Sequence, residues 1–183
     1  MIPPPRVWIC INGILARPGD AEGWTDRAVT WLHLHTGDQA EKFEYAAGPL
    51  TRRLRQQWRA EAIATMCSYY LRAGYEVSLI AHSNGADLVE RVIASHPLYR
   101  FRTVHLFAPA CTGDTLRGAL RYDPTDCGGI GALHLYGSAH DAALKLAALS
   151  RRLFGWAGLG YGDLGRRVND FRGLPRVHVH DDP

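Results

Sequence analysis

The stretch from residue 75 to 91 constrains the fold of this chain most strongly. The apolar run at 77–80 predicts a short buried strand, and apolar residues recur at helical spacing from Gly85 onward. Only the turn Ala81-His82-Ser83-Asn84-Gly85 separates the two patterns. The chain must therefore pass from a buried strand into a helix within a few residues, with a serine at the corner.

A serine on a sharp strand-to-helix turn, with small residues two positions before and after it, has the pattern called a nucleophile elbow. The strained backbone that such a turn requires costs about 1–3 kcal/mol. It would leave the N–H of Asn84 at a helix N-terminus, where developing negative charge is favoured. Two observations keep an alternative open. Ser83 would also suit an ordinary helix N-cap, and Ala81 stands where the pattern usually has glycine.

Strands and helices alternate along the rest of the chain, which predicts a three-layer α/β/α sandwich with a mainly parallel sheet. Further strands are predicted at 6–11, 101–108, 132–136 and 176–180, with a weaker one at 42–45. Helices are predicted at 24–35, at 51–73, from 85 to the His96-Pro97 break, and from 141 to 154. The segments 109–131 and 155–165 read as loops, and the first is long enough to be a candidate lid or binding loop. We expect a single domain, 1–183.

In the helix predicted at 51–73, large apolar residues recur about four positions apart, with charges between them. Such a stripe favours a core-facing side over a ligand site. Its members are Leu54, Trp58, Ala62, Met66 and Tyr69.

The charge balance argues against a nucleic-acid-binding protein. The 183 residues carry 21 Lys and Arg against 18 Asp and Glu, and the arginines are scattered rather than gathered in long runs. No apolar run approaches the roughly 20 residues that a membrane helix needs, and the N-terminus lacks the pattern of a secretory signal. We therefore predict a soluble, cytoplasmic protein that has no transmembrane segment and does not bind nucleic acid.

The four cysteines show no Cys-x-x-Cys pair and no histidine at zinc-finger spacing, so no metal site is predicted. Buried free thiols are the expected state and fit a reducing compartment. A bridge between Cys111 and Cys127, which flank one loop, is the alternative.

Four features come directly after predicted strands, where ligands bind in open α/β sheets. They are Asn12-Gly13-Ile14, Ser83, Asp141 and a C-terminal histidine, His178 or His180. Asp141 could also be only the N-cap of the helix that it begins, and Asp114 is the alternative acidic residue.

In this order of nucleophile, acid and histidine, the chain resembles the α/β-hydrolase superfamily in a small, nearly lidless form. The resemblance implies a serine hydrolase that cleaves an ester or similar acyl bond of a small-molecule or lipid-like substrate. It implies Ser83, Asp141 and His180 as the catalytic residues. The oxyanion hole would use backbone N–H groups of Asn84 and of the loop at Gly13 and Ile14. No metal or organic cofactor is implied.

The histidine is the least secure member of this set. His178 and His180 share one face of the last predicted strand, and His180 lies nearer the active edge. In the superfamily the histidine usually follows the last strand, whereas only Asp181-Asp182-Pro183 follow here. The alternative function is therefore a hydrolase-like binding or interaction domain without a competent histidine.

The other histidines are expected to have structural or surface roles. The side chain of His82 should point away from Ser83 and support the turn. His140 is expected in a loop, and His33 and His35 on a helix.

Overall fold

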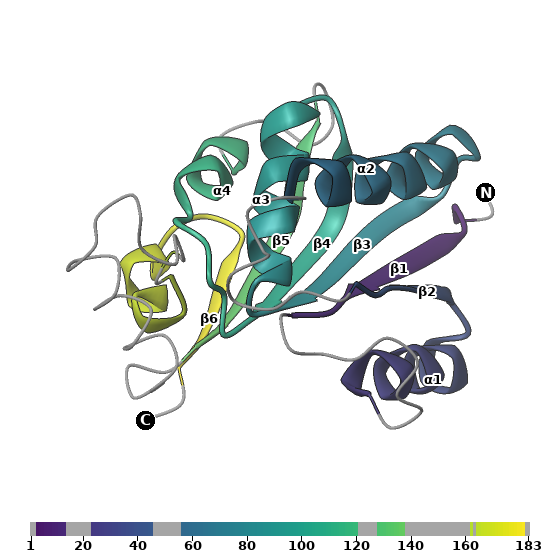
Figure 1. The fold of residues 1–183 in the computed structure, drawn as a ribbon, viewed down its shortest axis with the longest axis horizontal. Helices are drawn as coiled ribbons and strands as arrows, with labels where there is room; N and C mark the ends of the chain where they lie inside the picture. Colours follow the sequence, from purple (N-terminus) through teal and green to yellow (C-terminus); the bar gives the residue numbers. More distant parts are fainter. Residues whose placement is uncertain are drawn as a thin grey trace.

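A six-stranded parallel sheet forms the centre of the protein, with strand order β2-β1-β3-β4-β5-β6. The computed structural model describes residues 3–13, 23–45, 56–120, 128–137, 162 and 164–181. The strands are β1 (Arg6–Ile11), β2 (Gln39–Phe43), β3 (Glu76–His82), β4 (Arg100–Phe107), β5 (Gly129–Gly137) and β6 (Val177–Asp181). In Figure 1 the strands run obliquely across the picture, with helices above and below the sheet.

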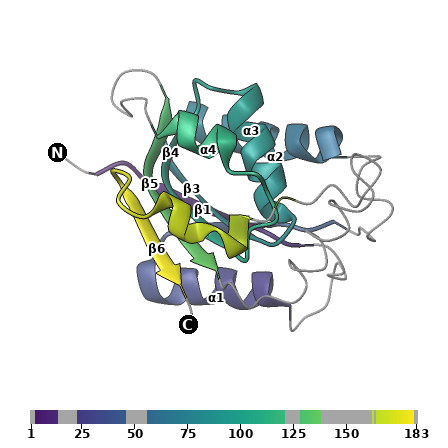
Figure 2. The same cartoon turned by 90° about the vertical axis from the view of Figure 1, so that its left-hand side faces the viewer.

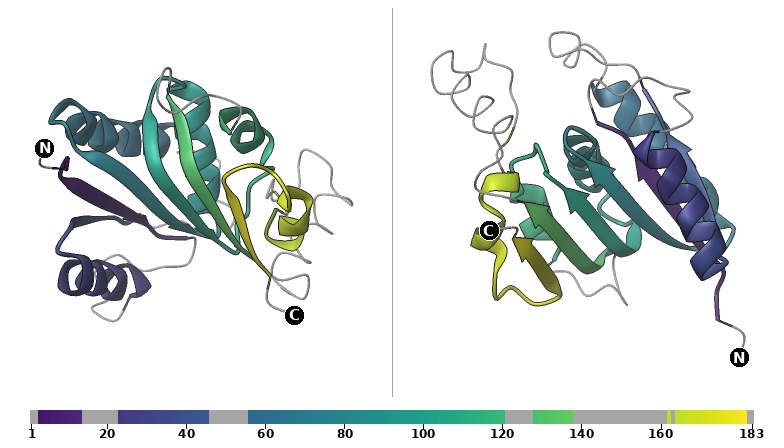
Figure 3. Two further views of the ribbon diagram at one scale, coloured as in Figure 1. Left: turned by 180° about the vertical axis from the view of Figure 1, so that it is seen from behind. Right: turned by 90° about the horizontal axis from the view of Figure 1, so that it is seen from below.

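The helices cover the two faces of the sheet unequally. On one face lie α2 (Gln56–Arg72), α3 (Gly85–Ser95) and α4 (Asp114–Ala119), whereas α1 (Trp24–Thr36) lies on the other (Figure 1, Figure 2). Right-handed crossovers explain this division, because the chain moves one way across the sheet from β1 to β2 and the other way from β2 to β5. The short 3₁₀ helices η3 (Leu164–Arg166) and η4 (Val168–Phe171) pack beside β5 and β6 (Figure 3).

The hydrophobic core lies between the sheet and the layer formed by α2, α3 and α4. Strand residues such as Ile9, Leu79 and Leu106 are fully buried there, and Leu88 and Val92 of α3 pack against them. On the opposite face, α1 contacts β1 and β2. The same face of β4, β5 and β6 carries aromatic and histidine side chains that are partly or fully exposed, which we call the open face.

The predicted α/β class and parallel sheet are confirmed. The first strand has the predicted bounds, and α1 and the last strand differ from prediction by one residue at each altered end. The strand predicted at 42–45 instead spans 39–43, and the one predicted at 132–136 is longer in both directions. Strand ends are less certain from sequence because pairing partners determine where a ladder stops.

Two predictions were wrong in detail. The segment 109–131 is not wholly irregular, because α4 occupies Asp114–Ala119 and β5 begins at Gly129. The stripe assigned to the core of α2 is also misplaced, since Trp58 and Tyr69 are each 68% exposed. The buried side of α2 is offset by one residue and includes small or hydrogen-bonded side chains, which let the helix approach the sheet closely. Its residues are Gln56, Arg59, Ala60, Ile63, Ala64, Cys67 and Tyr70.

The helix predicted at 141–154 and most of the loop predicted at 155–165 lie outside the described residues. Cys10, Cys67 and Cys111 are buried free thiols, as expected, so the alternative bridge from Cys111 is wrong. No helix in the described part of the chain is long and apolar enough to cross a membrane.

Candidate active site

Ser83 occupies the corner between β3 and α3 in a strained backbone conformation. Its φ is 53°, in the left-handed region that residues other than glycine rarely adopt. Three backbone hydrogen bonds hold the serine in place. Its N–H donates to the carbonyl of Phe107 at 2.8 Å, and its own carbonyl accepts from Ala86 and Ala110, each at 3.1 Å. The surrounding structure thus maintains a conformation that costs about 1–3 kcal/mol.

Gly85 is required by the close approach of the neighbouring strand. A Cβ at this position would lie 2.7 Å from the carbonyl oxygen of Asn12 and 2.9 Å from that of Ile11. Both are backbone atoms, which cannot rotate away. Ala81, at the other small position of the motif, is fully buried. The spacing of small residues around Ser83 therefore follows from packing against the end of β1.

The loop after β1 lies directly against the serine. A Cβ built on Gly13 would be 3.1 Å from the Cβ of Ser83 and equally close to the carbonyl oxygen of His82. Within the described residues, no acceptor takes the backbone N–H of Gly13 or of Asn84. Gly13 and Asn84 thus both lie beside Ser83, while Ile14 lies outside the described residues.

A buried polar network holds Asn84 in position. Its side-chain nitrogen donates to the hydroxyl of Tyr45 at 2.8 Å, and its side-chain oxygen accepts from Gln56 at 3.3 Å. Gln56 also donates to Asp87 at 2.7 Å, so α2 is tied to the first turn of α3. Nothing local in the sequence marks Tyr45 and Gln56 as supports of the site, because they lie 39 and 28 positions from Asn84 along the chain.

Glu90 organises the segment that follows β4. Its carboxylate accepts hydrogen bonds from the backbone N–H groups of Thr112 and Thr115, each at 3.1 Å. Burial raises the pKa of Glu90, and the backbone hydrogen bonds partly oppose this by lowering it. This buried carboxylate fixes the start of α4 close to Ala110, which donates to the carbonyl of Ser83. It too was not singled out from sequence.

His180 does not contact Ser83 in this structure. It lies on β6, three strands from β3, a separation of about 14 Å at the usual spacing between strands. Its ring stacks on Tyr136 at 4.2 Å, and its Nε2 is 3.4 Å from Nδ1 of His134. No hydrogen bond joins Ser83 to a histidine among the described residues. The topology thus places both residues on one sheet but does not bring them together.

Of the remaining candidate residues, some are exposed in the structure and others lie outside the described residues. Asp114 is exposed in the first turn of α4, and His82 is exposed with its ring 6.2 Å from that of Trp24. His33 and His35 are exposed on α1. Asp141 and His140 lie outside the described residues.

On the open face, His105, His134 and His178 are aligned across β4, β5 and β6. Neighbouring rings are nearly parallel, with centroids 4.2 and 4.5 Å apart. Phe107, Tyr136 and His180 form a second such row. Burial, together with smaller contributions from the neighbouring histidines, lowers the pKa of His105 to about 4. Burial also lowers the pKa of His134, so both rings are neutral at pH 7.

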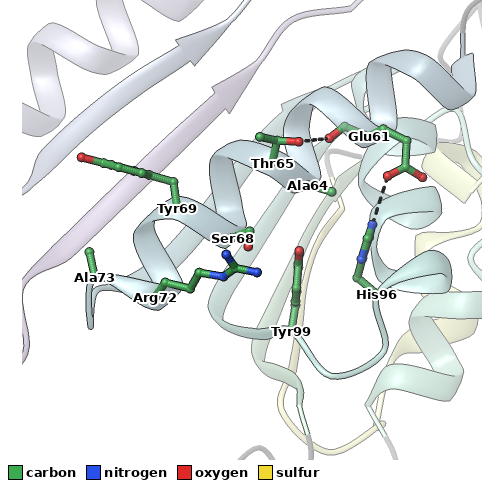
Figure 4. Close-up of a pocket in the computed structure, with 9 residues that line it drawn as sticks. All are labelled: Glu61, Ala64, Thr65, Ser68, Tyr69, Arg72, Ala73, His96 and Tyr99. Carbon is green, nitrogen blue, oxygen red and sulfur yellow. Dashed lines mark hydrogen bonds and ion pairs between the residues drawn. The ribbon is translucent and has the colours of Figure 1, made fainter.

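A hollow of about 600 Å³ lies away from Ser83, against the C-terminal half of α2. Figure 4 shows Arg72 and Ser68 on one side and Tyr99 and His96 on the other, with His96 Nε2 3.4 Å from Glu61. Tyr99 precedes β4, so this hollow is at the amino ends of the strands. Because ligands of open α/β sheets bind at the carboxyl ends, we do not assign it to the candidate active site.

No protein-family model matches the chain, and no curated protein matches its sequence. Among solved structures, the chain is similar to a proposed hydrolase of the α/β superfamily from Xanthomonas campestris pv. campestris. The TM-score is 0.54 at 15% sequence identity, and the match covers 97% of this chain and 87% of the other. Together with the parallel sheet and the strained serine after β3, this likeness shows that the protein has the α/β-hydrolase fold.

Proposed function

We propose that the protein is a serine hydrolase that cleaves an ester or similar acyl bond, with Ser83 as the nucleophile. The observation that carries this proposal is the backbone of Ser83, whose φ of 53° is held by three backbone hydrogen bonds. An N-cap serine needs no such strain, because its ordinary conformation is extended. Strain maintained at a polar residue that remains partly accessible to solvent supports a functional role.

In the proposed reaction, Ser83 Oγ attacks the acyl carbon while its proton passes to an imidazole, and the carbonyl oxygen becomes an oxyanion. The backbone N–H groups of Asn84 and of the loop at Gly13 and Ile14 would donate to that oxyanion. Loss of one such donor typically lowers the rate by about 10²–10³. The network from Gln56 and Tyr45 to Asn84 would keep the first donor in place.

Asp141 is proposed to orient the imidazole, and His180 to supply it. For His180 this role requires its ring to leave the stack on Tyr136, and the end of β6 to move as well, because three strand spacings of about 14 Å in all separate β6 from β3. The same observation favours a second candidate function, a hydrolase-like binding domain in which Ser83 lacks an activating base.

A fluorophosphonate probe, which reacts with activated serines, tests the nucleophile. We expect the wild type to be labelled and Ser83→Ala to be unlabelled. Ser95→Ala, at the exposed end of α3, is the matched control and should label like the wild type. Equal labelling of all three proteins would refute Ser83 as the nucleophile.

His180→Gln and His178→Gln then separate the two functions. If His180 is the base, His180→Gln lowers the labelling rate by at least about 10², whereas His178→Gln leaves it unchanged. If the folded wild type is not labelled at all, the binding domain is the better description.

A further inference from the structure

The open face brings four histidines from three neighbouring strands within reach of one another. His105 and His134 are aligned across β4 and β5, and His178 is aligned with His134 across β5 and β6. His180 lies two residues after His178 on the same face of β6. His178 and His180 are exposed, and His134 is partly exposed. Solvent therefore reaches a group of imidazoles that the proposed hydrolysis does not fully use.

Within this group, two ring nitrogens stand at a distance that suits a shared metal ion. His134 Nδ1 and His180 Nε2 are 3.4 Å apart. Two imidazole nitrogens, each about 2.0–2.1 Å from a tetrahedral zinc ion, are separated by about 3.3 Å. The two rings are within 13° of parallel, so one of them must turn before both in-plane lone pairs point at one ion, and the exposed side chain of His180 is free of the core for such a turn. For an N–H···N hydrogen bond the same distance is long.

The chemistry of the donors selects the class of metal. Both are imidazole nitrogens, which suit Zn²⁺, Cu²⁺ and Ni²⁺, whereas Mg²⁺ and Ca²⁺ prefer oxygen ligands. In the part of the chain that the structure describes, no three His, Cys, Asp or Glu side chains are already placed around one point. The protein thus offers two ligands, and water completes the coordination unless His178 turns toward the ion.

The stacked geometry argues against an aromatic ligand at the same place. The rings of His105 and His134 are within 1° of parallel, and those of Tyr136 and His180 within 7°. The facing sides of these rings are therefore covered by one another. A base-binding platform would need a free aromatic face.

We propose that His134 and His180 form a surface site for a divalent transition-metal ion, which joins the edge strand β6 to β5. This inference does not depend on the proposed hydrolase activity, but it competes with a catalytic role for His180, because one imidazole nitrogen cannot bind the ion and accept the proton of Ser83 at the same time. It gives His180 a role consistent with its observed position, three strands from Ser83.

Copper titration of the untagged full-length chain tests the site, since an affinity tag would supply competing histidines. We expect one Cu²⁺ to bind in calorimetry, and pulsed electron paramagnetic resonance to show two coordinated imidazoles. His134→Gln and His180→Gln should each weaken binding at least tenfold. His35→Gln, an exposed histidine on α1, is the matched control and should bind like the wild type.

A second measurement uses Zn²⁺ and the melting temperature. Zinc should raise the melting temperature of the wild type and of His35→Gln, but not of His134→Gln or His180→Gln, because only a folded chain holds the pair together. Circular dichroism of each variant without metal verifies that it folds. Copper held by one imidazole, or affinity unchanged in both pair variants, would mean adventitious binding and overturn the proposal.

Discussion

The carboxyl end of β3 and the open face of β4 to β6 belong to one sheet but are built in different ways. Around Ser83 the backbone is so closely packed that a Cβ added at Gly85 would lie only 2.7 Å from the carbonyl oxygen of Asn12. On the open face, side-chain rings stack at ordinary distances, and Phe107 remains 36% exposed. The first region admits one arrangement, whereas the second tolerates rotation of its rings.

This contrast shows that the tightest structural restrictions on residue type and conformation lie around Ser83. Strain, buried polar bonds and an obligatory glycine all occur within a few residues of Ser83. The open face has no strained residue among its stacked rings. Substitutions should therefore lower stability far more at the serine than on the open face.

Gly85→Ala should have the largest effect. The added methyl group would meet two backbone carbonyls, and overpacking of this kind costs about 3 kcal/mol. Gly118→Ala is the matched control, because a Cβ there meets nothing within 4 Å and alanine is the better helix former. Urea unfolding measures the free energy of unfolding of both variants. Equal stability of the two variants would mean that the crowding at Gly85 does not constrain the elbow.

Glu90→Ala should be next in size. It leaves the N–H groups of Thr112 and Thr115 without their acceptor, which costs about 2 kcal/mol. Glu61→Ala removes an exposed partner of His96 and should cost well under about 1 kcal/mol. The same urea series measures both, and similar losses would place Glu90 among ordinary surface carboxylates.

The contribution of Glu90 to the free energy of unfolding should depend on pH. Because burial raises its pKa above 4.5, the folded state binds the proton more tightly than the unfolded state. The resulting stability is present below pH 4.5 and is lost as the pH rises through the folded pKa. Unfolding free energies measured upward from pH 4 should fall more steeply for the wild type than for Glu90→Ala. A steeper fall in the variant would contradict the assigned direction.

Ser83→Gly and Ser83→Ala form a matched pair for the strain at the elbow. Both lack the hydroxyl and should abolish probe labelling. Glycine accepts a φ of 53° without penalty, so Ser83→Gly should be more stable than Ser83→Ala by about 1 kcal/mol. If the Ser83→Ala protein is as stable as the Ser83→Gly protein, the backbone at Ser83 is not strained.

The elbow could be predicted from sequence because its requirements are local. A buried strand, two small residues and a helical pattern follow one another within residues 77–93, and the structure places Ser83 at the corner between them. The prediction of β1 has a similar reason, since its five consecutive apolar residues, 7–11, need both faces of a strand covered.

What sequence could not predict depends on partners distant in the chain. The buried side of α2 includes Gln56, a polar residue that is buried only because Asn84 and Asp87 accept its hydrogen bonds. Likewise, the alignment of His134 with His178 requires that β5 and β6 be neighbours and in that register. Strand order is a global property, so no local pattern revealed the two stacked rows.

Tyr136→Phe should have the smallest effect and tests the other side of the comparison. It removes a hydroxyl whose only described contact is His105 Nδ1 at 3.4 Å, and it keeps the ring between Phe107 and His180. We expect a change in unfolding free energy within about 0.5 kcal/mol, because the lost bond is long and partly exposed. Copper affinity should also be unchanged, since the two nitrogens of the proposed site remain. A loss comparable to that of Gly85→Ala would show that the open face is as tightly determined as the elbow.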